Sequence, residues 1–218
     1  MALKSTGSIE NIGRRIELIS MDRHFQEISI ALYEQHYDGG VEFLVKTYSG
    51  IEDAPQRIDF VVQAMKILGG MDMTSDGRRL KHRCGATHKL ATRRLFLEAC
   101  KISPTENIEV APLRLYDKKL DGYVTAMSAN RGHYRLRTES DEEKTLVRRG
   151  AILSGLIKLA ELESVNNQDG EVAFPCGEAH DELIGLLLPR ALNVRSFLQQ
   201  EAMKASRGQL VAPSAQQE

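Results

Sequence analysis

The sequence predicts an α+β protein that is internally duplicated, with the order strand-strand-strand-helix-strand-helix occurring twice. Three observations lead to this fold class. Both halves show the same succession of β-rich and helical patterns. The predicted helices are apolar mainly on one face. The five-residue string CGxxH occurs at residues 84–88 and again at 176–180. Together they predict a two-layer sandwich whose halves are related by a pseudo-twofold axis.

Three segments rich in β-branched and aromatic residues open the first half, at 15–21, 25–35 and 41–49. The residues YDGG between the second and third segments are a strong turn signal. A helical pattern then runs from 53 to 68 and ends at Gly69 and Gly70. The half closes with a hairpin around the SDG at 75–77 and a helix over 85–101.

The second half repeats this order. Its predicted elements are strands at 110–117, 122–129 and 133–139, a helix over 142–162, a turn at 167–170, a strand at 171–174 and a helix opened by CGEAH. The broad apolar face of the helix over 142–162 carries Leu146, Val147, Leu153, Leu156, Ile157 and Ala160.

A shift of 92 positions, the spacing of Cys84 and Cys176, aligns residues 53–101 with 145–193 without a gap. The shift places Arg57 opposite Arg149, and it superposes Cys, Gly and His of the two CGxxH strings. From the composition, a second Cys would carry both the Gly and the His by chance roughly once in five hundred cases. We therefore expect two repeats, residues 1–105 and 106–205, which form either one compact domain or two tightly packed halves, followed by a disordered tail at 206–218.

Composition excludes several classes of protein. Of the 218 residues 42% are apolar and 27% charged, as in ordinary globular proteins, and no apolar run reaches the roughly 18 residues of a membrane span. Without a secretory signal pattern at the N-terminus, and with only three cysteines, we expect a cytoplasmic protein with reduced thiols. The sequence contains no GxGxxG, P-loop, HExxH or GxSxG motif, so the common nucleotide-binding and hydrolase classes have no positive support.

The CGxxH strings predict a metal site. We expect each string to open a helix, with Cys in the cap or first turn and His one turn later on the same face. A helix N-terminus lowers the pKa of a thiol and keeps an imidazole neutral, and these are the protonation states of a metal ligand. One string supplies too few ligands for zinc, but two strings together supply Cys84, His88, Cys176 and His180. The sequence therefore predicts zinc, or another transition metal, shared between the halves.

Other interpretations of these residues stay open at this point. Three ligands and a water would make a metal-dependent enzyme, with His82 as a substitute ligand. A cysteine paired with its own histidine would be a nucleophile. The same residues could also serve packing alone, as we expect for Cys100, which falls on the apolar side of its helix.

Charge is distributed unevenly around the two strings. Basic residues surround the first string, and Arg78, Arg79, Arg93 and Arg94 predict a cationic pocket for a small anionic molecule. Acidic residues surround the second string, so the arginines could instead pair with Glu171, Glu178, Asp181 or Glu182, within the chain or across a homodimer interface. The runner-up function is a regulatory module whose basic face recruits an anionic partner, and nucleic acid is the less favoured partner because no binding motif accompanies the basic residues.

Overall fold

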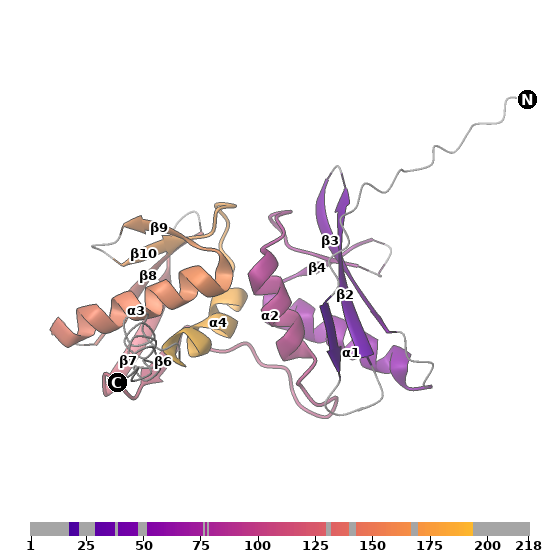
Figure 1. Cartoon of the computed structure of the whole chain (residues 1–218), viewed down its shortest axis with the longest axis horizontal. Coiled ribbons are helices and arrows are strands. Elements are labelled where there is room, and N and C mark those ends of the chain that lie inside the picture. The colour runs from indigo at the N-terminus through magenta and orange to yellow at the C-terminus, as the bar shows by residue number, and fades with distance from the viewer. Residues whose placement is uncertain are drawn as a thin grey trace, which may run out of the picture.

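The computed structural model describes residues 18–21, 29–37, 39–47, 52–75, 77, 79–129, 132–139, 143–166 and 170–193. These residues form four helices and two five-stranded antiparallel sheets, which confirms the α+β class. Each sheet and its two helices come from one half of the chain (Figure 1). The predicted tail at 206–218 and Arg78 lie outside the described residues.

The elements of the first half are β1 (Leu18–Met21), β2 (Ser29–Tyr37), β3 (Gly40–Thr47), α1 (Ala54–Gly69), β4 (Asp72–Met73), β5 (Leu80–Lys81) and α2 (Lys89–Ala99). Strands β2 and β3 pair down to Tyr37 opposite Gly40, which confirms the predicted turn. Helix α1 has a proline in its first turn, where the missing N–H costs nothing, and it ends at Gly70 in a left-handed conformation.

The elements of the second half are β6 (Arg114–Asp117), β7 (Gly122–Ser128), β8 (His133–Thr138), α3 (Glu143–Ala160), β9 (Glu163–Asn166), β10 (Glu171–Ala173) and α4 (Asp181–Asn193). The prediction missed β9, which lies between the predicted end of the helix at Leu162 and the predicted turn at 167–170. Helix α3 stops at Ala160 because Glu161 takes a left-handed conformation, and the chain then turns into the hairpin β9–β10. Leu146 and Val147 are 50% and 69% exposed, so the predicted apolar face of this helix is buried only further along.

The two sheets have the same strand order. It is β1-β2-β3-β5-β4 in the first half and β6-β7-β8-β10-β9 in the second, so each half inserts a hairpin between its two helices at one edge of its sheet. The halves therefore share a topology as well as an element order. That the shared topology arose by duplication stays a prediction.

The hydrogen bonds of two arginines show which residues of helices α1 and α3 are equivalent. Arg57 in α1 donates a hydrogen bond to the carbonyl oxygen of Cys100 at the end of α2, over 3.0 Å. In the second half the matching bond, to the carbonyl oxygen of Leu192 near the end of α4, comes from Arg148 over 2.5 Å. The gapless alignment, which placed Arg57 opposite Arg149, is thus wrong by one residue in this helix. The extra residue falls between the end of α3 and the second CGxxH string.

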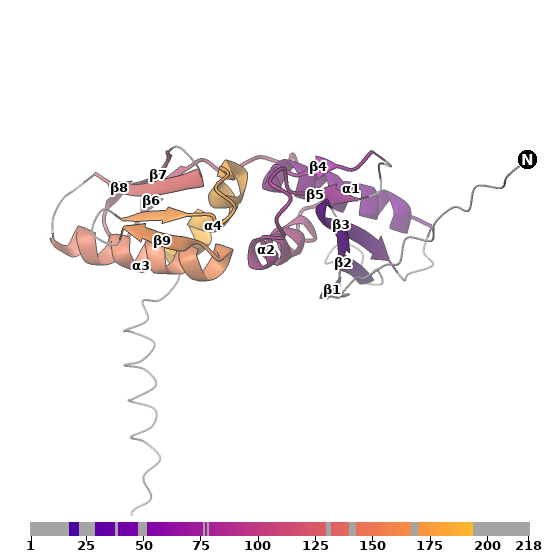
Figure 2. The same ribbon diagram turned by 90° about the horizontal axis from the view of Figure 1, so that it is seen from above.

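The halves lie side by side and meet at α2 and α4, as both ribbon views show (Figure 1, Figure 2). The start of each of these two central helices contacts the end of the longer helix of the other half, so α2 begins beside the end of α3 and α4 begins beside the end of α1. The backbone N–H of Leu90 in α2 donates to the carboxylate of Glu161 after α3, and Glu182 in α4 lies beside Gly70 after α1. These two contacts correspond under the pseudo-twofold relation between the halves.

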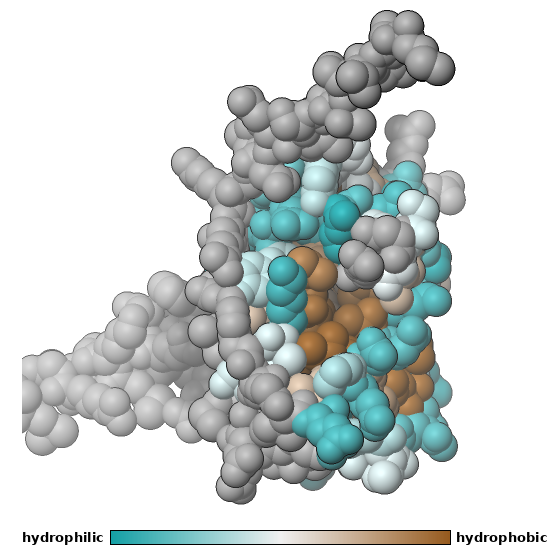
Figure 3. Space-filling model, turned by 90° about the vertical axis from the view of Figure 1, so that its right-hand side faces the viewer, coloured by the Kyte–Doolittle hydropathy of each residue, from teal (hydrophilic) through white to brown (hydrophobic). Residues whose placement is uncertain are grey.

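Buried apolar residues form one cluster that continues through both halves. The repeat boundaries near residue 105 stay a prediction, because this cluster does not end there. The outer end of the first half presents apolar side chains between hydrophilic ones (Figure 3). Within the described part of the chain, no helix is both long and apolar enough to cross a membrane.

The register of Arg148 generates the first prediction. Arg148 also pairs with Asp117 over 2.6 Å, and both side chains are at least nine-tenths buried. Arg148→Met leaves this carboxylate without its cation, so we expect a loss of about 3–5 kcal/mol in the free energy of unfolding, measured by chemical denaturation. Arg149→Met is the matched control, with an expected change within about 0.5 kcal/mol. Equal losses in the two variants would contradict the register described above.

Candidate metal centre

Each CGxxH string begins in a tight turn that precedes its helix. The backbone N–H of Gly85 donates to the carbonyl oxygen of His82 over 2.9 Å, and that of Gly177 donates to Phe174 over 3.0 Å. Both glycines have a positive φ, 73° and 74°, which glycine adopts without steric cost. The two cysteines, each directly before its glycine, therefore occupy the same position in matching turns.

A backbone N–H group points at each sulfur. The N–H of Ala86 donates to Sγ of Cys84 and the N–H of Glu178 donates to Sγ of Cys176, each over 3.4 Å. Hydrogen bonds donated to a sulfur stabilise its thiolate form. Each turn thus prepares its cysteine for the charge state in which it binds a metal.

The histidines follow as the last residues before the helices. The carbonyl oxygen of His88 accepts from the N–H of Thr92, and that of His180 accepts from Ile184. Helices α2 and α4 thus begin after the histidines, and the prediction that they begin at the glycines is wrong. The left-handed glycine interrupts the helical path, so each turn, and not a helix face, brings Cys and His together.

His88 has φ 39° and ψ 50°, a left-handed conformation that is uncommon for any residue other than glycine. Such conformations cost about 1–3 kcal/mol and collect at functional sites, where the surrounding structure enforces them. In His88 the conformation turns the chain into α2 while the ring stays beside Cys84.

The four predicted side chains converge at the seam between the halves. Nε2 of His88 lies 3.0 Å from Sγ of Cys84, and Nε2 of His180 lies 3.3 Å from Sγ of Cys176. The candidate ligand atoms of all four residues lie within 4.8 Å of one another. Both histidines are buried and both cysteines are half-buried. This cluster could hold a metal ion, as the sequence predicted.

Aromatic rings enclose the histidines of the cluster. The rings of His88 and His180 have centroids 4.4 Å apart, and His82 and Phe174 contact both of them edge to face. His82 and Phe174 hold equivalent positions, two residues before each cysteine. His82 lies outside the group of four, and its Nε2 is hydrogen-bonded to Thr92 over 2.8 Å.

Tyr134 is a residue of the site that sequence reasoning missed. This fully buried side chain from β8 accepts the backbone N–H of His180 over 2.6 Å and donates to Asp181 over 2.8 Å. Burial, and next the bond to Asp181, raise the pKa of Tyr134, so the phenol stays neutral. The inward position of Tyr134 on its strand was the only sequence signal, and it indicates no more than core.

Two glycines allow the β-hairpins to approach the turns closely. A side-chain carbon on Gly40 would lie 2.8 Å from the carbonyl oxygen of Gly85, and one on Gly132 would overlap the backbone of Glu178. Both have a positive φ. Each hairpin therefore supports the turn of its own half through backbone contact.

Burial is the largest cause of the pKa shifts of His88, His180 and Cys84. It lowers the pKa of His88 to about 4, with His180 as the next cause, and it also lowers the pKa of His180. The expectation of neutral imidazoles is thus supported. Burial raises the pKa of the Cys84 thiol to about 11, more than the N–H of Ala86 lowers it, and Cys176 adds to the rise. The expected low thiol pKa is therefore wrong for Cys84 without a cation, whose charge would reverse the balance.

The predicted anion-binding arginines do not form one group. Arg79 donates to Glu42 over 2.7 Å and to the hydroxyl of Tyr37 over 2.5 Å, both within its own sheet. Arg93 and Arg94 lie half-buried in α2, and neither forms a hydrogen bond or ion pair with another described residue. Arg94 lies near Arg190 of the second half. Burial lowers the pKa of Arg190, and the charge of Arg94 lowers it further.

The acidic residues of the second string also have partners in their own half. Glu171 pairs with Arg135 of the neighbouring strand, and Asp181 accepts from Tyr134. Pairing between the basic first string and these two acids, the alternative account of the charge asymmetry, is therefore absent from the described contacts.

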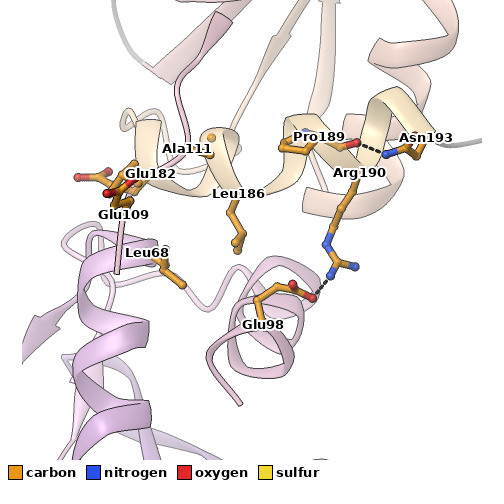
Figure 4. Close-up of a pocket in the computed structure, with 11 residues that line it drawn as sticks. Leu68, Glu98, Glu109, Ala111, Glu182, Leu186, Pro189, Arg190 and Asn193 are labelled. Carbon is orange, nitrogen blue, oxygen red and sulfur yellow. Dashed lines mark hydrogen bonds and ion pairs between the residues drawn. The ribbon is translucent and has the colours of Figure 1, made fainter. Parts of the chain in front are cut away.

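A cavity of about 320 Å³ lies at the seam, between the linker at 109–111 and helices α1, α2 and α4. Glu98, Glu109 and Glu182 line it together with Arg190, which pairs with Glu98, while Leu68 and Leu186 point into it (Figure 4). Its charge is thus more acidic than basic, and neither Arg93 nor Arg94 lines it. An anion site built on those two arginines would lie elsewhere.

Comparison with models of known protein families, with curated proteins and with solved structures gave no match.

The buried His82 generates the second prediction. Its pKa falls to about 3, first through burial and then through His88 and His180. In the unfolded chain the pKa of this imidazole is near 6.5, so the unfolded state binds the proton more tightly than the folded state does. The buried His82 therefore costs no stability above pH 6.5, and the free energy of unfolding decreases as the pH falls from 6.5 toward 3. His82→Phe copies the equivalent Phe174 and should remove about 5 kcal/mol of this loss once the pH has fallen below the folded-state pKa.

The measurement is the free energy of unfolding of metal-stripped protein at several pH values. An unchanged slope in His82→Phe would show that His82 does not titrate as described.

Proposed function

We propose that the protein binds one transition-metal ion, zinc, through Cys84, His88, Cys176 and His180, and that the ion joins the two halves. The convergence of these four side chains carries the proposal. Thiolate sulfur and imidazole nitrogen are the donors that zinc prefers, and two of each form a standard structural set.

The dimensions of the cluster support a tetrahedral ion. Zn–S bonds near 2.3 Å and Zn–N bonds near 2.1 Å place sulfur and nitrogen roughly 3.6 Å apart. The Sγ–Nε2 distances within the two strings are 3.0 and 3.3 Å. A small outward movement of each side chain would therefore accommodate the metal.

Four protein ligands favour a structural role over a catalytic one. A catalytic zinc keeps a coordination position for water or substrate, and a complete Cys2His2 set leaves none. The cysteine–histidine nucleophile is also less favoured, since burial raises the pKa of the Cys84 thiol to about 11 and a nucleophile needs its thiolate at neutral pH.

The third prediction tests metal binding directly. Protein purified without an affinity-tag metal column should contain one zinc per chain by elemental analysis. Cobalt substitution should give the thiolate charge-transfer bands and tetrahedral visible spectrum of a Cys2His2 site. At free metal about a thousand times above Kd, the ion should add about 4 kcal/mol to the free energy of unfolding.

Variants separate this site from adventitious binding. Loss of a ligand in Cys84→Ser should weaken binding by more than about 100-fold, because even changes that only support a ligand cost 10–100-fold. Cys100, which is buried in the core, gives the matched control, and Cys100→Ser should keep the wild-type stoichiometry and spectrum. Equal metal content in the two variants would refute the site.

A second function rests on Arg93 and Arg94. Their guanidinium groups form no hydrogen bond or ion pair with another described residue, and Arg94 lies near another cation, Arg190. Such an arrangement supports binding of a small phosphate or carboxylate compound. Recruitment of a larger anionic partner, and a homodimer, stay predictions.

The fourth prediction tests the anion site by thermal denaturation with and without phosphate. Changing Arg93 and Arg94 together to Gln should abolish stabilisation by phosphate and leave the Tm in phosphate-free buffer within about 2 °C. Arg137→Gln, on an exposed strand position, is the control and should keep the phosphate response. A lower Tm in phosphate-free buffer with an intact phosphate response would reject the site.

A further inference from the structure

We propose that Cys84 and Cys176 are also a site of oxidative modification, at which a hydroperoxide converts the two thiolates into a disulfide between the halves and the metal is released. The metal-release part rests on the proposed function. The disulfide part rests only on the positions of the cysteines.

The three cysteines differ in their surroundings. Sγ of Cys84 and Sγ of Cys176 lie within 4.8 Å of each other, and both residues are half-buried. Cys100 is 2% exposed and packs in the hydrophobic core. Oxidants reach exposed thiols first, so the pair should react while Cys100 does not.

The two turns also differ in accessibility. The residues before the two cysteines, Arg83 and Pro175, are both exposed, but the residues after Cys176, Gly177 and Glu178, are exposed whereas those after Cys84, Gly85 and Ala86, are half-buried. A peroxide therefore meets Cys176 first. Cys84, already beside it, acts as the resolving thiol.

The chemistry needs no group other than the peroxide. The Cys176 thiolate attacks the terminal oxygen of the peroxide, the O–O bond breaks, and the hydroxide (from hydrogen peroxide) or alkoxide (from an organic hydroperoxide) that leaves is protonated to water or the alcohol, which yields a sulfenic acid on Cys176. The sulfur of Cys84 then attacks this sulfur, as the thiolate in the zinc-loaded protein or as a thiol that passes its proton to the departing oxygen in the metal-free chain; the S–O bond breaks and water leaves. Two electrons pass from the sulfurs to the peroxide. The solvent supplies two protons in the zinc-loaded protein, and the Cys84 thiol supplies one of the two in the metal-free chain.

Metal and disulfide exclude each other because they use the same two sulfurs. The oxidised cluster offers only two imidazoles, too few to retain zinc, so the ion passes to the solvent. The new S–S bond joins residues 84 and 176 of different halves. One cross-link between the halves thus replaces another, and the fold is kept.

The test treats zinc-loaded protein with hydrogen peroxide in the presence of a colorimetric zinc indicator, followed by alkylation and peptide mapping. We expect zinc to be released in proportion to a Cys84–Cys176 cross-linked peptide, with Cys100 alkylated. Dithiothreitol should then restore zinc binding. Zinc release with sulfinic acid and no cross-link, a cross-link to Cys100, or cross-links between chains would each overturn the proposal.

Metal-free protein separates this proposal from the metal site itself. If the protein fails to take up zinc, the proposed function fails before peroxide is added. The disulfide must nevertheless form in the metal-free chain, and its absence there overturns the inference whatever the outcome with zinc.

Single variants test the order of attack. In metal-free Cys84→Ser, peroxide should leave a sulfenic acid on Cys176 that a dimedone probe captures. In metal-free Cys176→Ser, labelling of Cys84 should be several-fold slower. Cys100→Ser should form the cross-link like the wild type, and equal labelling rates in the first two variants would overturn the assigned roles.

Discussion

The seam depends on the meeting of two helix N-termini. His88 and His180 directly precede α2 and α4, and their rings are 4.4 Å apart, so the positive ends of two helix dipoles lie close together. Negative groups have to offset this charge. Helix α4 carries Asp181 and Glu182 in its first turn, while α2 has no acid there and receives Glu161 from the other half.

The same constraint explains the uneven charges of the two CGxxH strings. The basic residues around the first string suggested an anion site or a direct match with the acidic second string. Instead, the acid that the start of α2 lacks comes from the end of α3. Thiolates on Cys84 and Cys176 would add further negative charge between the helix starts, and a cation between them would allow both to ionise.

Much of this arrangement could be predicted from the sequence, because it depends on local patterns. Turn residues, apolar periodicity and the repeated CGxxH string located most elements and the four clustered residues. The start of each central helix was misplaced, since a glycine that must take φ near 73° looks in sequence like a permissive helical residue. Strand β9 was missed because it has only four residues, ESVN, of which Val165 alone is apolar, so no alternating apolar pattern marks it.

Long-range partners could not be predicted in this way. Nothing local indicates that Arg79 pairs with Glu42 across a sheet, or that Tyr134 holds the backbone of His180 from another element. Arg148 and Arg149 are adjacent in sequence and differ in the side of α3 that they occupy. The alignment without a gap matched Arg57 to Arg149, which is the wrong one of the two. These contacts depend on the packing of whole elements, which a one-dimensional pattern does not encode.

The continuous core bears on what a metal at the seam would contribute. Apolar residues of both halves belong to one buried cluster, so hydrophobic contact already holds the halves together. Such contact is non-directional and tolerates small sliding movements, whereas four ligands around one ion tolerate almost none. A metal would therefore fix the relative position of the halves more than it would drive their association. The turns at Gly85 and Gly177, which position the two cysteines, are each in close backbone contact with a hairpin of their own half.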